Sequence, residues 1–156
     1  MQMLHRVSAL SSQRLTSPVH LTKFRNSGPT CSVSRASAQM AAHKNVLGGE
    51  LVPCADGCGY SRDGYCRVID GDFGVHAVAA VVSVEFLTFT KAQGNDLSTP
   101  RPPSFPGLKD GDRWCLCASR WLEAQQNGKA PKVVLEATDA KALDIIPLEL
   151  LQQYAA

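Results

Sequence analysis

The sequence predicts an α+β fold: a single small domain over residues 45–156, with a short mixed or antiparallel sheet, two to three helices on one face, and long loops rich in proline and glycine. Three observations support this class. An apolar, β-branched run at 75–82 is typical of a buried strand. Helix signals follow directly at 84–93. Four prolines then interrupt residues 95–106, where regular structure cannot continue.

The elements after the first strand alternate irregularly. Ser83 can cap the helix at 84–93, with Glu85 in its first turn and Gly94 as a left-handed stop. The rest of the chain predicts, in order, a turn at 110–111, a strand at 113–117, a helix at 119–127 stopped by Gly128, a strand at 133–137, a single turn around 139–143, an extended segment at 145–146, and a final helix begun by Pro147.

The N-terminal part of the chain has no acidic side chain before Glu50, and it is rich in serine, threonine and arginine. This composition is typical of an organelle transit peptide, because an import leader stays unfolded and cationic. We expect residues 1–39 to be a disordered leader recognised by the organelle import machinery, with cleavage between Arg35 and Met40. A chloroplast is the favoured destination, since the Cys-Ser-Val-Ser-Arg-Ala stretch resembles chloroplast processing sites; a mitochondrion is the alternative.

The charge of the chain depends on whether this leader is counted. Five of the 16 basic side chains and none of the 14 acidic ones lie in residues 1–38, so the remainder holds 11 basic against 14 acidic side chains, a net charge of about −3. Because the remainder has no cluster of Lys and Arg, nucleic acid is not an expected partner. No apolar run approaches the roughly 20 residues of a membrane span, so membrane insertion is not expected.

Long motifs cover nearly the whole chain after Asn45. The most distinctive are GNDLSTPRP at 94–102, FPGLK at 105–109, GDRWCLCA at 111–118 and VLEAT at 134–138. With these motifs the chain resembles the small, mostly bacterial family known as domain of unknown function 2237. The resemblance implies a bacterial-type protein with a eukaryotic leader. It implies no activity, because the family's role is not established.

The cysteines depart from the family pattern in three places. Two adjacent cysteines follow the glycine at position 64 in the family, where this chain has Tyr65 and Cys66. Ala79 stands where the family has a cysteine, and Cys58 is not at a usual family position. The resemblance therefore implies four family-type cysteines: Cys54, Cys66, Cys115 and Cys117.

These four thiolates can make a tetrahedral zinc site if the fold brings them together. Cys115 and Cys117 are two apart on an expected strand, so both sulfurs would point to one face. The single residue between them differs from the two-residue gap of a zinc knuckle. Two other interpretations stay open: buried thiols that only pack, and disulfide or redox use.

A cysteine nucleophile would need a base within hydrogen-bond reach. His76 and Asp96 are the candidate bases, and Cys115 and Cys117 the candidate nucleophiles; a buried, hydrogen-bonded imidazole is the structural alternative for His76.

The polar loop after Gly94 is the other candidate site. Its hydrogen-bonding groups are suited to a small molecule or an anion, although Asn and Asp at such a place also cap turns. The candidate ligand-binding residues are Asn95, Asp96, Ser98, Thr99, Arg101 and Arg113. The sequence favours a module that binds a small ligand or a metal. The alternatives are an enzyme with a cysteine-based or polar-loop site, and a protein-interaction adaptor with purely structural cysteines.

Overall fold

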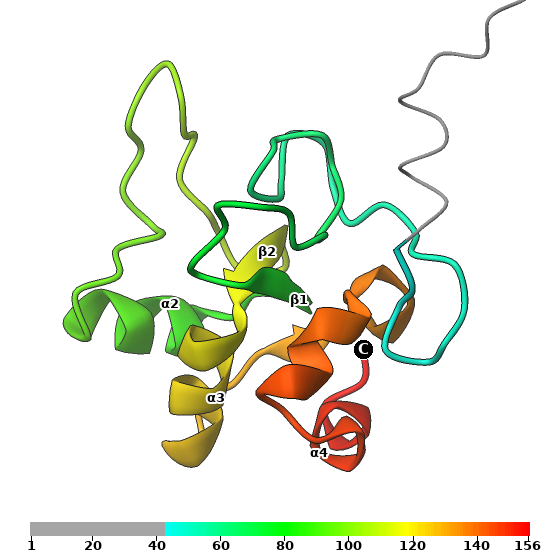
Figure 1. Ribbon diagram of the computed structural model, residues 1–156. Coiled ribbons are helices and arrows are strands. Elements are labelled where there is room, and N and C mark those ends of the chain that lie inside the picture. The colour runs from blue at the N-terminus through cyan, green and yellow to red at the C-terminus, as the bar shows by residue number, and fades with distance from the viewer. Residues whose placement is uncertain (1–42) are drawn as a thin grey trace, which may run out of the picture. The chain divides into compact units, whose positions relative to one another are not determined.

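The computed structural model describes residues 43–156, and the expected leader at residues 1–39 lies outside the described residues (Figure 1). The described chain forms a three-stranded antiparallel sheet in the order β2-β1-β3, together with three α-helices, which confirms the predicted α+β class. The strands are β1 (His76–Val81), β2 (Arg113–Cys117) and β3 (Lys132–Val133). The helices are α2 (Val84–Ala92), α3 (Ala118–Gln126) and α4 (Leu148–Gln153), with short 3-10 helices η1 (Leu135–Ala137) and η2 (Ala140–Asp144).

The two faces of the sheet are covered differently. Alternate residues of β1 point to opposite faces; Val78 and Ala80 belong to the main apolar core, whereas Ala79 packs with buried cysteines. Each helix contributes a fully buried side chain to the main core: Phe86, Trp121 and Leu151. Figure 1 shows α3 and α4 below β1 and β2, α2 to their left, and the long loops above them. The loops therefore build the surface on which polar and sulfur side chains gather.

The helix after β1 begins and ends as predicted. The Ser83 hydroxyl accepts a hydrogen bond from the Phe86 N–H at 3.2 Å, and Glu85 lies in the first turn. After the helix, Gly94 has φ +83°, in the left-handed region where a side chain is strained. The sequence predicts both ends of this helix because each depends on a single residue: a serine hydroxyl at the start and a glycine after the end.

The strand predicted at 133–137 is wrong after Val133. The Val134 N–H still donates to the Ala79 carbonyl at 2.8 Å, but the Ala137 N–H then donates back to the Val134 carbonyl and closes a 3-10 turn. The hydroxyl of buried Thr138 also donates to the Val134 carbonyl, at 2.8 Å. Hydrogen bonds that return to Val134 replace the strand ladder that the β-branched sequence favours.

The extended segment predicted at 145–146 is also wrong. Ile145 ends η2 with φ −122° and ψ −36°, and the Ile146 N–H donates to the Ala142 carbonyl at 2.9 Å. Ile146 is fully buried in the main core. Its apolar character reflects burial at a helix end and not a place in the sheet.

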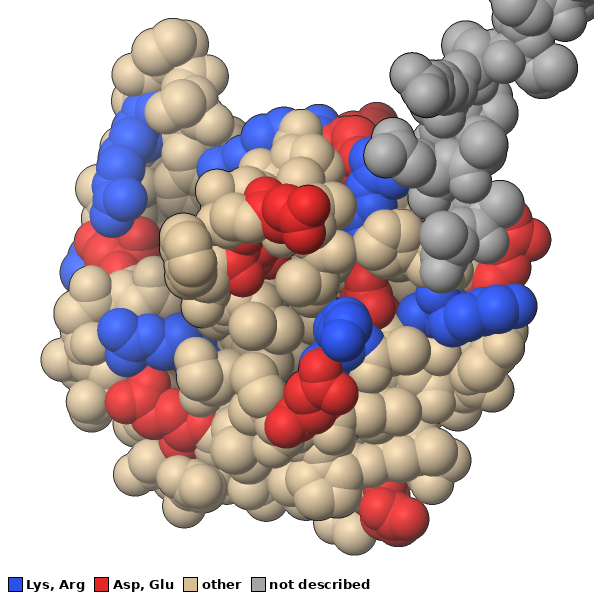
Figure 2. Space-filling model, viewed as in Figure 1, with Lys and Arg blue, Asp and Glu red and all other residues tan. Residues whose placement is uncertain are grey.

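The described surface carries both signs of charge. In the view of Figure 2, Lys and Arg are interspersed with Asp and Glu. No helix within residues 43–156 is long and apolar enough to cross a membrane.

Candidate functional site

Three thiols converge in the loop that precedes β1. The sulfur atoms of Cys54, Cys58 and Cys66 all lie within 4.8 Å of one another, and all three side chains are buried. We call these residues the three-thiol cluster. Three ligand atoms this close can hold a metal ion.

Backbone hydrogen bonds within the loop hold this cluster. The Cys54 N–H donates to the Gly64 carbonyl at 2.8 Å, and the Gly64 N–H donates to the Cys58 carbonyl at 3.1 Å. Gly59 has φ +86°, and a Cβ there would collide with the Tyr65 carbonyl oxygen. The loop can therefore close on itself only with glycine at position 59.

The thiols perturb one another electrostatically. The pKa of Cys58 is lowered, first by a hydrogen bond from Cys54 and then by one from Cys66. The pKa of Cys54 is raised, with its bond to Cys58 as the largest cause, and burial raises the pKa of Cys66. Close acidic groups in a buried site oppose ionisation beyond the first, so the cluster favours one negative charge shared among its thiols.

The other two predicted ligands, Cys115 and Cys117, contact different groups. Cys115 is buried beside the three-thiol cluster, where its thiol contacts Cys66, and its sulfur donates to the His76 carbonyl at 3.0 Å. Cys117 is partly exposed, and its Sγ lies 3.2 Å from His76 Nε2. The structure thus brings together Cys54, Cys66 and Cys115, adds Cys58, and places Cys117 at a different site.

Cys117, His76 and Asp72 form a hydrogen-bonded chain. His76 Nδ1 lies 2.6 Å from Asp72 Oδ1, and the other Asp72 oxygen accepts the His76 backbone N–H at 2.8 Å. The Asp72 side chain is fully buried, whereas 32% of the His76 side chain is exposed. The pKa of His76 is raised to about 9, first by the bond to Cys117 and then by the bond to Asp72. A carboxylate fixes the imidazole, and the imidazole faces a thiol.

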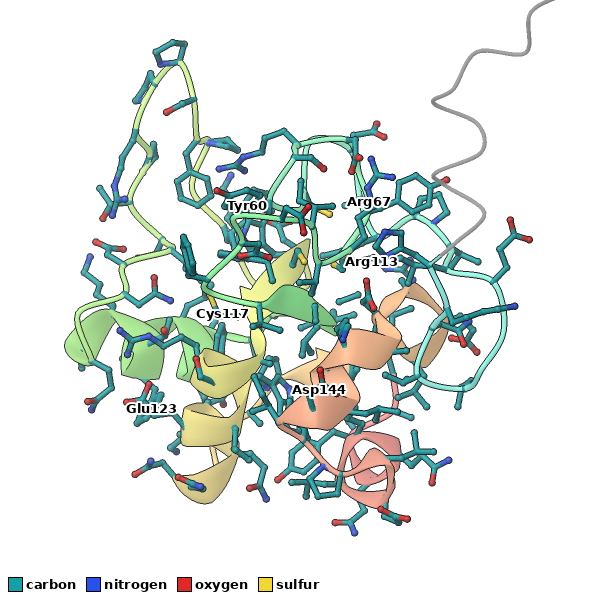
Figure 3. The ribbon with its side chains drawn as sticks, in the orientation of Figure 1. Tyr60, Arg67, Arg113, Cys117, Glu123 and Asp144 are labelled. Atoms are coloured by element: carbon teal, nitrogen blue, oxygen red, sulfur yellow. The ribbon has the colours of Figure 1, made fainter. Side chains whose placement is uncertain are left out.

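A pocket of about 430 Å³ adjoins this chain of residues, and His76 and Cys115 line part of its wall. Phe105 and Trp114 form an edge-to-face pair in the wall, with ring centroids 5.4 Å apart. The Arg62 guanidinium lies over the Trp114 ring, 5.1 Å from its centroid. Figure 3 shows Tyr60, another wall residue, on the loop above the strands, and Cys117 where β2 meets α3.

The predicted polar loop borders this pocket but serves mainly its own structure. The Asp96 carboxylate accepts hydrogen bonds from the backbone and hydroxyl groups of Ser98 and Thr99, and it pairs with Lys91 Nζ at 3.1 Å. These contacts, with the Thr99 hydroxyl first, lower the pKa of Asp96. A carboxylate held so firmly as an anion is a poor proton acceptor, and its bonds are those of a turn cap.

Of the remaining candidate ligand-binding residues, two lie in the pocket wall and Arg113 does not. Asn95 and Arg101 line the pocket, and an Arg101 guanidinium nitrogen donates to the Asp96 carbonyl at 3.0 Å. Arg113 is exposed at the start of β2, opposite Val81, and lies apart from the pocket.

Residues 44–155 match a family model described as an uncharacterised protein conserved in bacteria, DUF2237. The chain belongs to this family. Membership confirms the resemblance predicted from the motifs, and it assigns no activity to this DUF2237 protein. No curated protein matches the chain.

Two residues of this DUF2237 site were not among the sequence candidates. The family resemblance does not point to Cys58, because it is not at a usual family position, although its four-residue spacing from Cys54 in a glycine-containing loop indicates that the two thiols can meet. Asp72 precedes His76 by four residues in the sequence, but that spacing suggests proximity only on a helix. Here residues 72–75 form turns, so the contact depends on loop geometry.

Proposed function

We propose that this protein is a small metal-binding module in which the thiolates of Cys54, Cys58 and Cys66 hold a soft ion, such as zinc or copper(I). The convergence of three sulfurs within 4.8 Å carries the proposal. Thiolates favour these ions over magnesium or calcium.

The cluster has suitable dimensions for such an ion. A zinc–sulfur bond of about 2.3 Å requires sulfur atoms roughly 3.8–4.0 Å apart, so binding would need at most a modest contraction of the cluster. Inert thiols that only fill a core need no mutual contact. Here the three sulfurs come together from three points of one loop whose backbone is held by its own hydrogen bonds.

The fourth position of a zinc ion would come from outside the three-thiol cluster. Cys115 lies beside the cluster and contacts Cys66, but it is not one of the three converging ligands, and its sulfur donates to the His76 carbonyl at 3.0 Å. A zinc ion would therefore take a water or small ligand as its fourth partner, as sites with three protein ligands do. Copper(I) would be satisfied by three thiolates.

Metal analysis of the reduced, tag-free protein tests this proposal. We expect one zinc or copper(I) per chain, with cobalt(II) substitution giving thiolate-to-metal charge-transfer absorption. Cys58→Ser should abolish stoichiometric binding, and Cys117→Ser is the matched control that should retain it. Substoichiometric metal in every preparation and after reconstitution, with all thiols freely alkylated in the folded protein, would exclude a metal site.

A second candidate function is the binding of a small anionic ligand in the pocket. The specific observation is that two arginine residues, Arg62 and Arg101, line the pocket, while the carboxylate of Asp96 is already paired with Lys91. Aromatic walls beside fixed cations suit a compact ligand with an apolar body and a carboxylate. Benzoate should therefore raise the melting temperature and benzamide should not. Arg101→Gln should remove the benzoate effect and Arg113→Gln should keep it; equal effects of benzoate and benzamide would exclude anion selectivity.

For location, we propose import into a chloroplast, with the mitochondrion as the alternative; the acid-free composition of residues 1–38 supports it. N-terminal sequencing of the protein from its native source should find the mature terminus between Arg35 and Met40. A mature protein that begins at Met1 or Gln2 would exclude a cleaved leader.

A further inference from the structure

We propose that Cys117 is the nucleophile of an acyl-transfer site, with His76 as its base and Asp72 as the residue that positions His76. The site would act on small esters, thioesters or amides that carry a negative charge. This site is separate from the three-thiol cluster. The charge of its substrate rests on the anion-binding pocket proposed above, but the nucleophile does not.

The geometry meets the requirements for an activated thiol. A nucleophile and its base must come within hydrogen-bond reach, and a third group must orient the base. Cys117 Sγ lies 3.2 Å from His76 Nε2, and His76 Nδ1 lies 2.6 Å from Asp72 Oδ1. Because Asp72 holds Nδ1, the nitrogen that faces the thiol is Nε2. Asp72 is fully buried and also accepts the His76 N–H, so it fixes both the ring and its backbone.

Of the two cysteines on β2, Cys115 lines the pocket, but Cys117 is the one whose sulfur contacts the imidazole. It is partly exposed, whereas Cys115 is buried and donates to the His76 carbonyl. Cys117 is also the N-cap residue of α3, and within the described chain no side-chain hydrogen bond caps that helix. The first-turn N–H groups of a helix favour negative charge nearby, which suits both a thiolate and the oxyanion of a tetrahedral intermediate.

The backbone around His76 is unusual in a way that serves this arrangement. Val75 has φ +48°, a left-handed conformation that is rare for a β-branched residue, and β1 has a register shift between His76 and Val78. A Cβ at Gly74 would lie 2.8 Å from His76 Cε1 and 3.2 Å from Cys117 Sγ. The chain thus bends so that its backbone passes directly over the thiol–imidazole pair. Such conformations cluster at functional sites.

The substrate would bind in the pocket. His76 forms part of its wall, so a ligand in the pocket lies beside the imidazole that contacts Cys117. Arg62 and Arg101 line the same pocket, and Arg62 is the other non-glycine residue with positive φ in the described chain, at +59°. Two cations next to aromatic rings select a small acyl compound with a carboxylate on its acyl or leaving group.

The proposed reaction balances with water as the only co-reactant. His76 Nε2 already holds the proton of the Cys117 thiol when Sγ forms a bond to the acyl carbon, in agreement with the raised pKa of His76. The bond from that carbon to the leaving group then breaks, and the leaving group takes the proton from Nε2. Water next attacks the Cys117 thioester and gives its proton to Nε2. The acid product leaves, and the pair of Cys117 Sγ and protonated His76 Nε2 is restored.

Acylation by two chromogenic esters tests the proposal on the reduced full-length chain. The neutral probe is 4-nitrophenyl acetate and the charged probe is mono-4-nitrophenyl glutarate. We expect a burst of nitrophenolate, one acyl group per chain by intact mass, and its location on Cys117 by peptide mapping. His76→Gln should slow the burst by about 10²–10⁴-fold, the usual contribution of a positioned base. Asp72→Asn should slow it less and lower the pKa of His76 measured by NMR.

The controls separate the nucleophile from the pocket. His43→Gln removes a histidine that also contacts an aspartate, Asp139 at 3.0 Å, and it should leave the burst rate unchanged. Arg101→Gln should reduce the preference for the glutarate ester over the acetate ester. If the wild-type protein shows no preference for the glutarate ester, only the anionic substrate class is overturned. An acyl group spread over several cysteines, a wild-type chain that is not acylated, or a His76→Gln burst as fast as wild type would overturn the nucleophile.

Discussion

The titration of His76 tests the Cys117–His76–Asp72 chain without any ligand. Its pKa is raised from 6.5 to about 9, first by Cys117 and then by Asp72. Cys117→Ser should therefore lower the pKa of His76 markedly, and Asp72→Asn should lower it by a smaller amount. Both variants replace atoms at the contact and leave the volume of the site nearly unchanged.

The same shift contributes to stability in a defined pH range. Because the folded pKa is above the unfolded value, the protonated imidazole stabilises the native state fully below about pH 6.5. This contribution is lost as the pH rises through about 9. One pKa unit corresponds to 1.36 kcal/mol, so the shift sets a ceiling of about 3 kcal/mol. Since 32% of the side chain is exposed, solvent screening reduces the expected contribution to about 1–2 kcal/mol.

Two measurements check this prediction. The pKa can be followed through the imidazole Cε1 proton by NMR, and the free energy of unfolding by urea denaturation at pH 6, 7.5 and 9. The wild-type protein should lose about 1–2 kcal/mol more than His76→Gln over that range. A wild-type pKa near 6.5 that is unchanged by Cys117→Ser would refute the reasoning.

Three further substitutions test the framework, each by urea denaturation. Gly59→Ala should destabilise the fold by more than about 2 kcal/mol and also reduce metal binding, because it forces a Cβ against the Tyr65 carbonyl; Gly48→Ala, which has positive φ but open space, should cost less. Ser83→Ala should cost about 1 kcal/mol through loss of the cap on α2, and no cost would contradict the observed cap bond. Thr138→Val should cost about 1–3 kcal/mol, since it leaves the buried Ala79 N–H without its hydroxyl acceptor; a neutral effect would show that another acceptor replaces it.

The elements that the sequence predicted correctly are those determined by neighbouring residues. The strand β1 and the helix α2 follow from an apolar run, a serine cap and a glycine stop. The strand predicted at 133–137 failed because its β-branched residues also fit a buried turn, and only the tertiary contact between Thr138 and β1 distinguishes the two.

The candidate site was predictable in its residue types but not in its groupings. The sequence identified cysteines, His76 and the polar loop, yet it could not show that Cys117 would face His76 while Cys115 faces Cys66. Both sulfurs were expected on one face of β2. The register shift between His76 and Val78 changes what each sulfur meets across the strand pair. A register shift of this kind cannot be predicted from the pattern of apolar residues.

The division between the two faces of the sheet explains how the fold can hold such a site. The helix-covered face contains the large buried side chains Phe86, Trp121 and Leu151, which supply most of the apolar burial. The loop-covered face contains the features that oppose stability: a buried carboxylate at Asp72, ionisable thiols, and positive φ at Arg62 and Val75. Because β1 belongs to both faces, the core fixes the strand from which His76 projects. Loops alone would not hold a thiol, an imidazole and a carboxylate at hydrogen-bond distance. The destabilising features of the loop-covered face are therefore offset through a strand that the helices already hold in place.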